Sequence, residues 1–219
     1  PGLKALSDLI EGPRQSRAVS MHAAAVGVSG ACSFVLAGTV AGWLGWQWAI
    51  ALGGSGALLA FAITAVMLPS QPPQRRDGAQ AALLNFAPVL RNRSALAYSL
   101  GYMVHTWEMS VLRTWVVTFL VFTAAHTGND APLVSPTAIA TALALFGVWA
   151  SVSGNELAMR IGRRRFVFIV MLASMAMALG IGFASAVSYE FAAILCVLYG
   201  ALIWADSSSL TAGAAGSAL

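Results

Sequence analysis

Long apolar stretches alternate with short polar segments along the whole chain. Each stretch holds about 20 or more residues with few charges, the length that an α-helix needs to cross the hydrocarbon core of a membrane. The six stretches cover residues 19–44, 48–68, 96–122, 135–157, 166–187 and 191–212. This pattern predicts an all-α membrane protein, a polytopic bundle of transmembrane helices.

The composition excludes a soluble domain. Only 9% of the 219 residues are charged, whereas soluble domains carry about 25% charged residues, and so few charges cannot cover a soluble surface. Cys32 and Cys196 both lie inside apolar stretches, so we expect buried thiols and neither a disulfide nor a metal site. The net charge of +4 reflects where the basic residues lie and does not indicate nucleic-acid binding.

Basic residues concentrate in alternate connections. All but one of the 12 Lys and Arg residues precede the first stretch, separate the second from the third, or separate the fourth from the fifth. If the helices alternate in direction, these connections share one side, which the positive-inside rule identifies as cytoplasmic. Trp43, Trp46 and Trp48 would then mark the outer interface. We expect an integral protein of the bacterial cytoplasmic (inner) membrane, with its basic loops in the cytoplasm.

Three ionisable residues interrupt the third stretch. His105, Glu108 and Arg113 fall within a wedge about 140° wide on a helix that turns about 100° per residue. Charges at the bilayer centre are costly and usually face a cavity or a bundle interior. One interpretation is a substrate and proton pathway, in which Glu108 is the protonatable carboxylate, His105 tunes it or relays protons, and Arg113 attracts an anionic substrate. The alternative is a buried polar network that joins helices and binds nothing.

The sixth stretch contains a second intramembrane carboxylate. Asp206 lies in its cytoplasmic half and is followed by Ser207, Ser208 and Ser209, so this helical turn is unusually polar. Asp206 would belong to the same substrate and proton pathway. The alternatives are a hydrogen-bonded contact between helices, or a residue close enough to the cytoplasm to be hydrated.

A glycine pair marks a packing face on the first stretch. Gly38 and Gly42 form a GxxxG pattern. Small residues at this spacing let membrane helices approach closely. We therefore expect both glycines to contact a neighbouring helix.

The connection between the fourth and fifth stretches carries a specific motif, NELAMRIGRRR at residues 155–165. It resembles the signature loop of the major facilitator superfamily, G-x-L-A-D-R-x-G-R-[RK]-x. Asn155 and Met159 stand where Gly and Asp are usual, with Gly154 adjacent to the first and Glu156 able to replace the missing acid. Glycine permits the tight turn, and the arginines hold neighbouring helix ends in one conformation. The matching positions are Leu157, Ala158, Arg160, Gly162, Arg163 and Arg164.

The resemblance implies an internal fragment with a partial major facilitator superfamily fold. Residues 1–18 would be the end of helix 4 and a cytoplasmic loop, and residues 19–68 would be helices 5 and 6 of the N-terminal half. Residues 69–94 would form the central cytoplasmic loop, and residues 95–219 helices 7–10 of the C-terminal half. The partners would be the lipid bilayer and the missing helices of the same parent chain.

A protein of this family would be a secondary active transporter. It would move a small solute, such as an organic anion, by alternating access, with protons as the candidate coupling ion. Helices 7 and 10 would line the central cavity, which is where the ionisable residues of the third and sixth stretches lie. A non-transporting membrane sensor or scaffold on the same fold stays open as the alternative. The chain has no GxSxG, HExxH or paired-Asp motif, so we expect no enzyme activity, no catalytic residue and no cofactor.

Overall fold

The computed structural model confirms a bundle of six long apolar helices. It describes residue 10 and residues 12–67, 87–129 and 131–217, within which every regular element is an α-helix. All six long helices have the length and hydropathy of membrane spans. The expected central loop, residues 69–94, lies largely outside the described residues. The helices are α2 (Gly12–Leu44), α3 (Trp46–Met67), the short α4 (Ala87–Arg91), α5 (Arg93–His126), α6 (Pro136–Ile161), α7 (Arg163–Ala184) and α8 (Tyr189–Ser217).

Local sequence accounts for several helix ends. The Asn92 side chain accepts hydrogen bonds from the backbone N–H groups of Ser94 and Ala95, and so caps α5. Ser135 caps α6 in the same way, with a proline at the first helical position. The start of α2 differs from the expectation, because the helix already begins at Gly12 and includes residues 12–18, which were expected before the first span.

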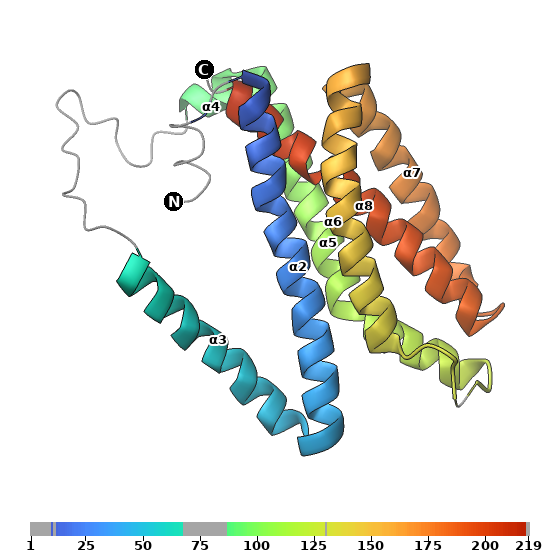
Figure 1. Cartoon of the computed structure of the whole chain (residues 1–219). Helices are drawn as coiled ribbons and strands as arrows, with labels where there is room; N and C mark the ends of the chain where they lie inside the picture. Colours follow the sequence, from blue (N-terminus) through green and yellow to red (C-terminus); the bar gives the residue numbers. More distant parts are fainter. Residues whose placement is uncertain (1–9, 11, 68–86, 130, 218–219) are drawn as a thin grey trace.

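Helix α8 lies at the centre of the packed bundle. It packs against α5, α6 and α7, while α2 lies along α6 (Figure 1). The core near one end contains Leu120, Leu143, Tyr189 and Cys196, all 2% exposed or less. Helix α3 diverges from the bundle and has no buried residue. The tryptophans at the α2–α3 turn are exposed, as an aromatic belt requires.

Glycines set how closely the helices approach. A Cβ added at Gly154 of α6 would collide with the backbone of Ala205 of α8, so these two helices touch main chain to main chain. Gly38 of α2 faces Thr137 of α6, where an added Cβ would lie 3.3 Å from the threonine side chain. Gly42 faces no atom within 4 Å among the described residues, so its packing role stays a prediction. Because Thr137 lies in the first turn of α6, Gly42 extends past the end of that helix.

The two cysteines have different environments. Cys196 is buried in the core as expected, and both thiols are free. The expectation is wrong for Cys32, which is exposed on the surface of α2. Most of the surface of α2 away from α6 is exposed, so an apolar position in the sequence was not sufficient to bury this side chain.

Candidate functional site

A histidine of α5 and a carboxylate of α8 meet inside the bundle. His105 Nδ1 lies 2.9 Å from Asp206 Oδ1, and the two side chains are 2% and 4% exposed. At about 1.5 Å of rise per residue, His105 lies roughly 18 Å along α5 from its first residue. This is about a third of the way along a helix of 34 residues, which is deep enough to lie within a hydrocarbon core of about 30 Å. The contact is an ion pair when His105 carries a proton.

Several buried polar atoms around this pair lack a hydrogen-bond partner among the described residues. They include both ring nitrogens of His105, Asp206 Oδ1 and Ser209 Oγ. The His105–Asp206 contact is therefore short enough for charge attraction, but its angles are not those of a hydrogen bond. Close by, Ser151 of α6 and Ser208 of α8 share a hydrogen bond of 2.6 Å. Unsatisfied polar atoms buried this deeply are costly unless water, a proton or a ligand completes them.

Glu108 has a different neighbour from His105. Its half-buried carboxylate interacts with the hydroxyl of Tyr199 on α8, whereas the His105 ring stacks on Tyr102 at a centroid distance of 5.7 Å. His105 and Glu108 were expected to share one polar wedge, and no direct interaction joins them among the described residues. The reason is helical geometry, because two residues three positions apart point about 60° apart and meet different side chains of α8.

Arg113 points toward another helix. Its guanidinium lies against Gly30 of α2, where an added Cβ would come within 3.2 Å of Arg113 Nη2. The absence of a side chain at Gly30 leaves the space that the half-buried arginine occupies. The three residues of the predicted wedge therefore make three separate contacts. Of the four predicted pathway residues, only His105 and Asp206 are brought together in the described structure.

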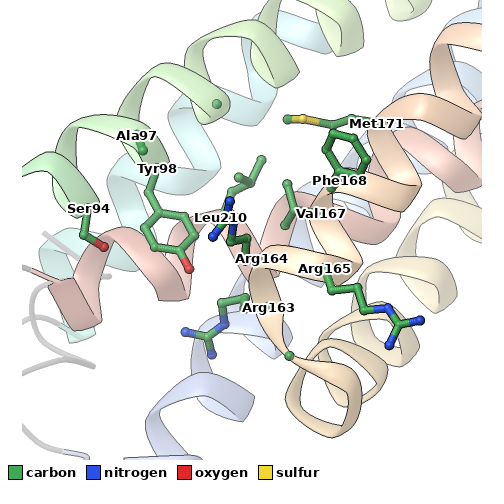
Figure 2. Close-up of a pocket in the computed structure, with 12 residues that line it drawn as sticks. Ser94, Ala97, Tyr98, Arg163, Arg164, Arg165, Val167, Phe168, Met171 and Leu210 are labelled. Atoms are coloured by element: carbon green, nitrogen blue, oxygen red, sulfur yellow. The ribbon is translucent and has the colours of Figure 1, made fainter.

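The arginine turn between α6 and α7 has the tight geometry that its sequence predicts. Gly162 ends α6 and precedes α7 with φ of +92°, a backbone conformation that favours glycine. Arg160 and Arg164 are exposed, and Arg163 is half-buried. Figure 2 shows Arg163, Arg164 and Arg165 beside residues of α5 and α8, around a cavity at this end of the bundle.

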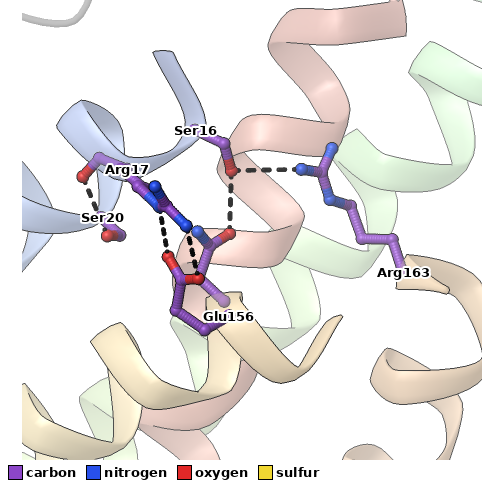
Figure 3. Close-up of polar contacts among 6 residues, drawn as sticks. Ser16, Arg17, Ser20, Glu156 and Arg163 are labelled. Carbon is purple, nitrogen blue, oxygen red and sulfur yellow. Dashed lines mark hydrogen bonds and ion pairs between the residues drawn. The ribbon is translucent and has the colours of Figure 1, made fainter. Parts of the chain in front are cut away.

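A second polar cluster joins α2 to the end of α6. Arg17 of α2 donates two hydrogen bonds to Glu156 of α6, from Nε at 2.8 Å and from Nη2 at 3.0 Å (Figure 3). Next to it, the Ser16 hydroxyl donates to Asn155 Oδ1 at 3.0 Å and accepts from Arg163 Nη2 at 3.2 Å. The contacts combine a buried hydroxyl–amide bond with an exposed, bidentate ion pair. We call this group, Ser16, Arg17, Asn155, Glu156 and Arg163, the basic-end cluster.

Sequence reasoning missed three of the five residues of the basic-end cluster. Ser16 and Arg17 were expected before the first span, and Asn155 counted only as a departure from the loop motif. The earlier start of α2 at Gly12 places Ser16 and Arg17 on a helix that packs along α6. The sequence did contain a signal. Ser16 and Arg17 adjoin the first apolar stretch, and Asn155 and Glu156 lie at the end of the fourth. Nothing in the sequence pairs these two segments.

The described residues contain no group of three or more His, Cys, Asp or Glu side chains that could hold a metal ion. The groups inside the bundle that can bind protons, carry charge or form hydrogen bonds include His105, Asp206, Glu108, Tyr199 and Arg113. Such groups inside a bundle of membrane helices typically mark a path for ions or solutes.

Comparison with known proteins agrees with the fold and with the arginine turn. The Major Facilitator Superfamily matches residues 1–218 of the chain. No curated protein matches the chain, and no solved structure matches it. The match extends over the spans that carry both polar clusters. The chain thus belongs to the Major Facilitator Superfamily, a family of membrane transporters.

Proposed function

We propose that the protein is a secondary active transporter that moves a small solute by alternating access and couples this movement to protons. The observation that carries the proposal is the His105–Asp206 pair, which is buried between two membrane helices and has polar atoms of its own, and the nearby Ser209 hydroxyl, without a hydrogen-bond partner among the described residues. A pair that served packing alone would have its hydrogen bonds completed within the protein. This one leaves atoms free for a proton, water or solute.

The energetics of burial connect this pair to transport. An unpaired charge in a dry bundle is costly, so the charge state of Asp206 and His105 decides whether helices α5 and α8 can close around them. Binding or releasing one proton changes that balance. A solute whose own charge or hydrogen-bonding groups complete the pair would change it as well. Binding of a proton and binding of the solute would therefore both affect whether α5 and α8 close around the pair.

The remaining intramembrane groups extend the proposed pathway. Glu108, in contact with Tyr199, is a second carboxylate that can carry a proton. Arg113 supplies a positive charge that would attract an organic anion. The missing helices of the parent chain would complete the wall of the cavity.

The basic-end cluster supplies the conformational element. The family layout assigns α2 to the N-terminal half and α6 to the C-terminal half, so the Arg17–Glu156 pair would hold the two halves together at the basic end. The positive-inside rule makes this end cytoplasmic, in a bacterial inner membrane. Opening the cavity on this side requires the Arg17–Glu156 and Ser16–Asn155 contacts to break. An ion pair as exposed as this one is weak enough to break and reform.

Proton flux in proteoliposomes tests the proposal. The protein is reconstituted with a pH-sensitive dye inside, and pools of organic anions, cations and neutral metabolites are added in turn. We expect wild-type protein to move protons with some pools only, and Asp206→Asn to lose this flux while keeping its fold. Glu190→Gln is the matched control, because Glu190 pairs with Asn129 outside the pathway.

Three outcomes would contradict the proposal or part of it. If the proton flux of wild-type protein is the same with every solute pool and no uptake is saturable, the non-transporting sensor or scaffold is favoured. Unchanged coupled transport in Glu108→Gln would remove Glu108 from the mechanism and leave the His105–Asp206 pair as the proton site. Unchanged coupling in Asp206→Asn would overturn the role of the pair.

A further inference from the structure

A cavity opens at the basic end of the bundle and extends to Gly101 and Leu210, each one helical turn from a member of the His105–Asp206 pair. It has a volume of about 850 Å³ and lies between the first turns of α5, the first turns of α7 and the last turns of α8 (Figure 2). This volume is within the range of pockets that hold small organic ligands, about 300–1,000 Å³. Neither the proposed proton pathway nor the Arg17–Glu156 pair uses this space.

The walls of the cavity change character with depth. Its rim carries the consecutive arginines 163–165, at the start of α7. Deeper walls are formed by Val167, Phe168 and Met171 of α7 and by Leu210 of α8. Met171 follows Arg165 by six residues along the helix, which corresponds to about 9 Å. A ligand that fits this gradient has an anionic head and a hydrocarbon tail.

The arginines at the rim lack acidic partners. Among the described residues, no Asp or Glu pairs with Arg164 or Arg165, and Arg163 donates only to the Ser16 hydroxyl. The loop also carries Met159 where its sequence motif usually has Asp. In Figure 2 the Arg164 guanidinium lies toward the middle of the cavity, whereas those of Arg163 and Arg165 point to opposite sides. The Arg164 guanidinium thus faces the cavity without an acidic partner among the described residues, and Arg163 and Arg165 flank it at the rim.

We propose that this cavity binds one anionic phospholipid of the leaflet on the basic side of the membrane. Arginine is suited to phosphate because its planar guanidinium donates several hydrogen bonds in a fixed geometry. A free phosphate would leave the apolar walls exposed to water, and a neutral lipid would leave the arginines uncompensated. An anionic phospholipid satisfies both parts of the site. Whether this leaflet is the cytoplasmic one depends on the proposed orientation of the protein, but the binding site itself does not.

The lipid would connect the membrane to the basic-end cluster. Arg163 lines the cavity and also holds the Ser16 hydroxyl, which bonds to Asn155. A headgroup phosphate that draws Arg163 into the cavity would compete with Ser16 for the same guanidinium. The lipid content of the membrane would then influence how firmly α2 is held to α6 and α7.

Lipid retention measured by native mass spectrometry tests the site. The protein is purified in detergent and incubated with phosphatidylglycerol or with zwitterionic phosphatidylcholine, and bound lipids are counted. We expect one phosphatidylglycerol to be retained in preference to phosphatidylcholine. Each arginine near an anionic headgroup should strengthen binding about fivefold, the equivalent of about 1 kcal/mol. The double variant Arg164→Gln/Arg165→Gln should therefore weaken retention by about 25-fold.

Two further variants distinguish specific lipid binding in the cavity from nonspecific attraction of lipid to positive charge. Arg14→Gln/Arg160→Gln removes the same charge from exposed residues that do not line the cavity, so it should retain the lipid like wild type. Ala97→Trp keeps every arginine but fills the space from an exposed position on the wall, so it should lose the lipid. Equal losses in both double variants, retention in Ala97→Trp, or no preference for phosphatidylglycerol in wild-type protein would overturn the proposal.

Discussion

Removal of one member of the His105–Asp206 pair leaves the other buried without its partner. A carboxylate left without its partner is a charge that is costly to bury, whereas a buried imidazole has a neutral form that costs less. We therefore expect His105→Leu to destabilise the fold more than Asp206→Leu does. The double variant His105→Leu/Asp206→Leu should recover most of the loss, because apolar replacements of a buried pair are often neutral.

Thermal unfolding in detergent, followed by tryptophan fluorescence, measures this difference. Val104→Leu serves as the control, because Val104 adjoins His105 in sequence but faces outward. If the losses of the two single variants simply add in the double variant, the two side chains do not interact energetically. Equal losses in the two single variants would show that Asp206 is already protonated in the native protein.

At the level of the helices, the glycines differ in how much space surrounds them. Gly154→Ala places a methyl group against the backbone of Ala205, so α6 and α8 must separate. Overpacking of this kind costs about 1–3 kcal/mol, and we expect a clear fall in the unfolding temperature. Gly180→Ala is the matched control on α7, because nothing lies within 4 Å of its added methyl group among the described residues. It should be neutral or stabilising, since alanine favours helix over glycine.

An unfolding temperature of Gly154→Ala equal to that of Gly180→Ala would show that the contact between α6 and α8 is looser than the structure has it. A destabilised Gly180→Ala would instead show that another helix covers that face of α7. Both variants carry the same chemical change, so the difference between them isolates packing.

Hydropathy was sufficient to predict the helices, because a spanning segment must be apolar along its whole length whatever it packs against. The contacts of the candidate site could be identified only from the three-dimensional structure. His105 and Glu108 share a face of one helix, but their partners, Asp206 and Tyr199, come from α8 and could not be assigned from spacing within one segment. The basic-end cluster was missed for the same reason, since Arg17 and Glu156 are 139 residues apart in the chain.

Across the whole molecule, α6 links the two polar clusters. Ser151 bonds to Ser208 of α8, two residues from Asp206 in the chain. Asn155, one helical turn along from Ser151, bonds to Ser16 of α2. A displacement of α6 relative to α2 therefore also moves the serine contact beside the buried carboxylate. This arrangement gives a direct mechanical path between the proposed proton site and the proposed closure at the basic end.

The population of the closed state can be followed with spin labels at Met21→Cys of α2 and Leu157→Cys of α6, both exposed, after Cys32 and Cys196 are replaced by alanine. Distances between the labels are measured by double electron–electron resonance in nanodiscs. We expect Glu156→Gln to raise the population of long distances several-fold, because it removes the charge that holds Arg17. Exchanging the charges in Arg17→Glu/Glu156→Arg should restore the wild-type distribution. Glu190→Gln, at the other end of the bundle, should have no effect. A distribution unchanged by Glu156→Gln would mean that the ion pair does not hold α2 to α6, and that the buried Ser16–Asn155 bond and helix packing keep this end closed.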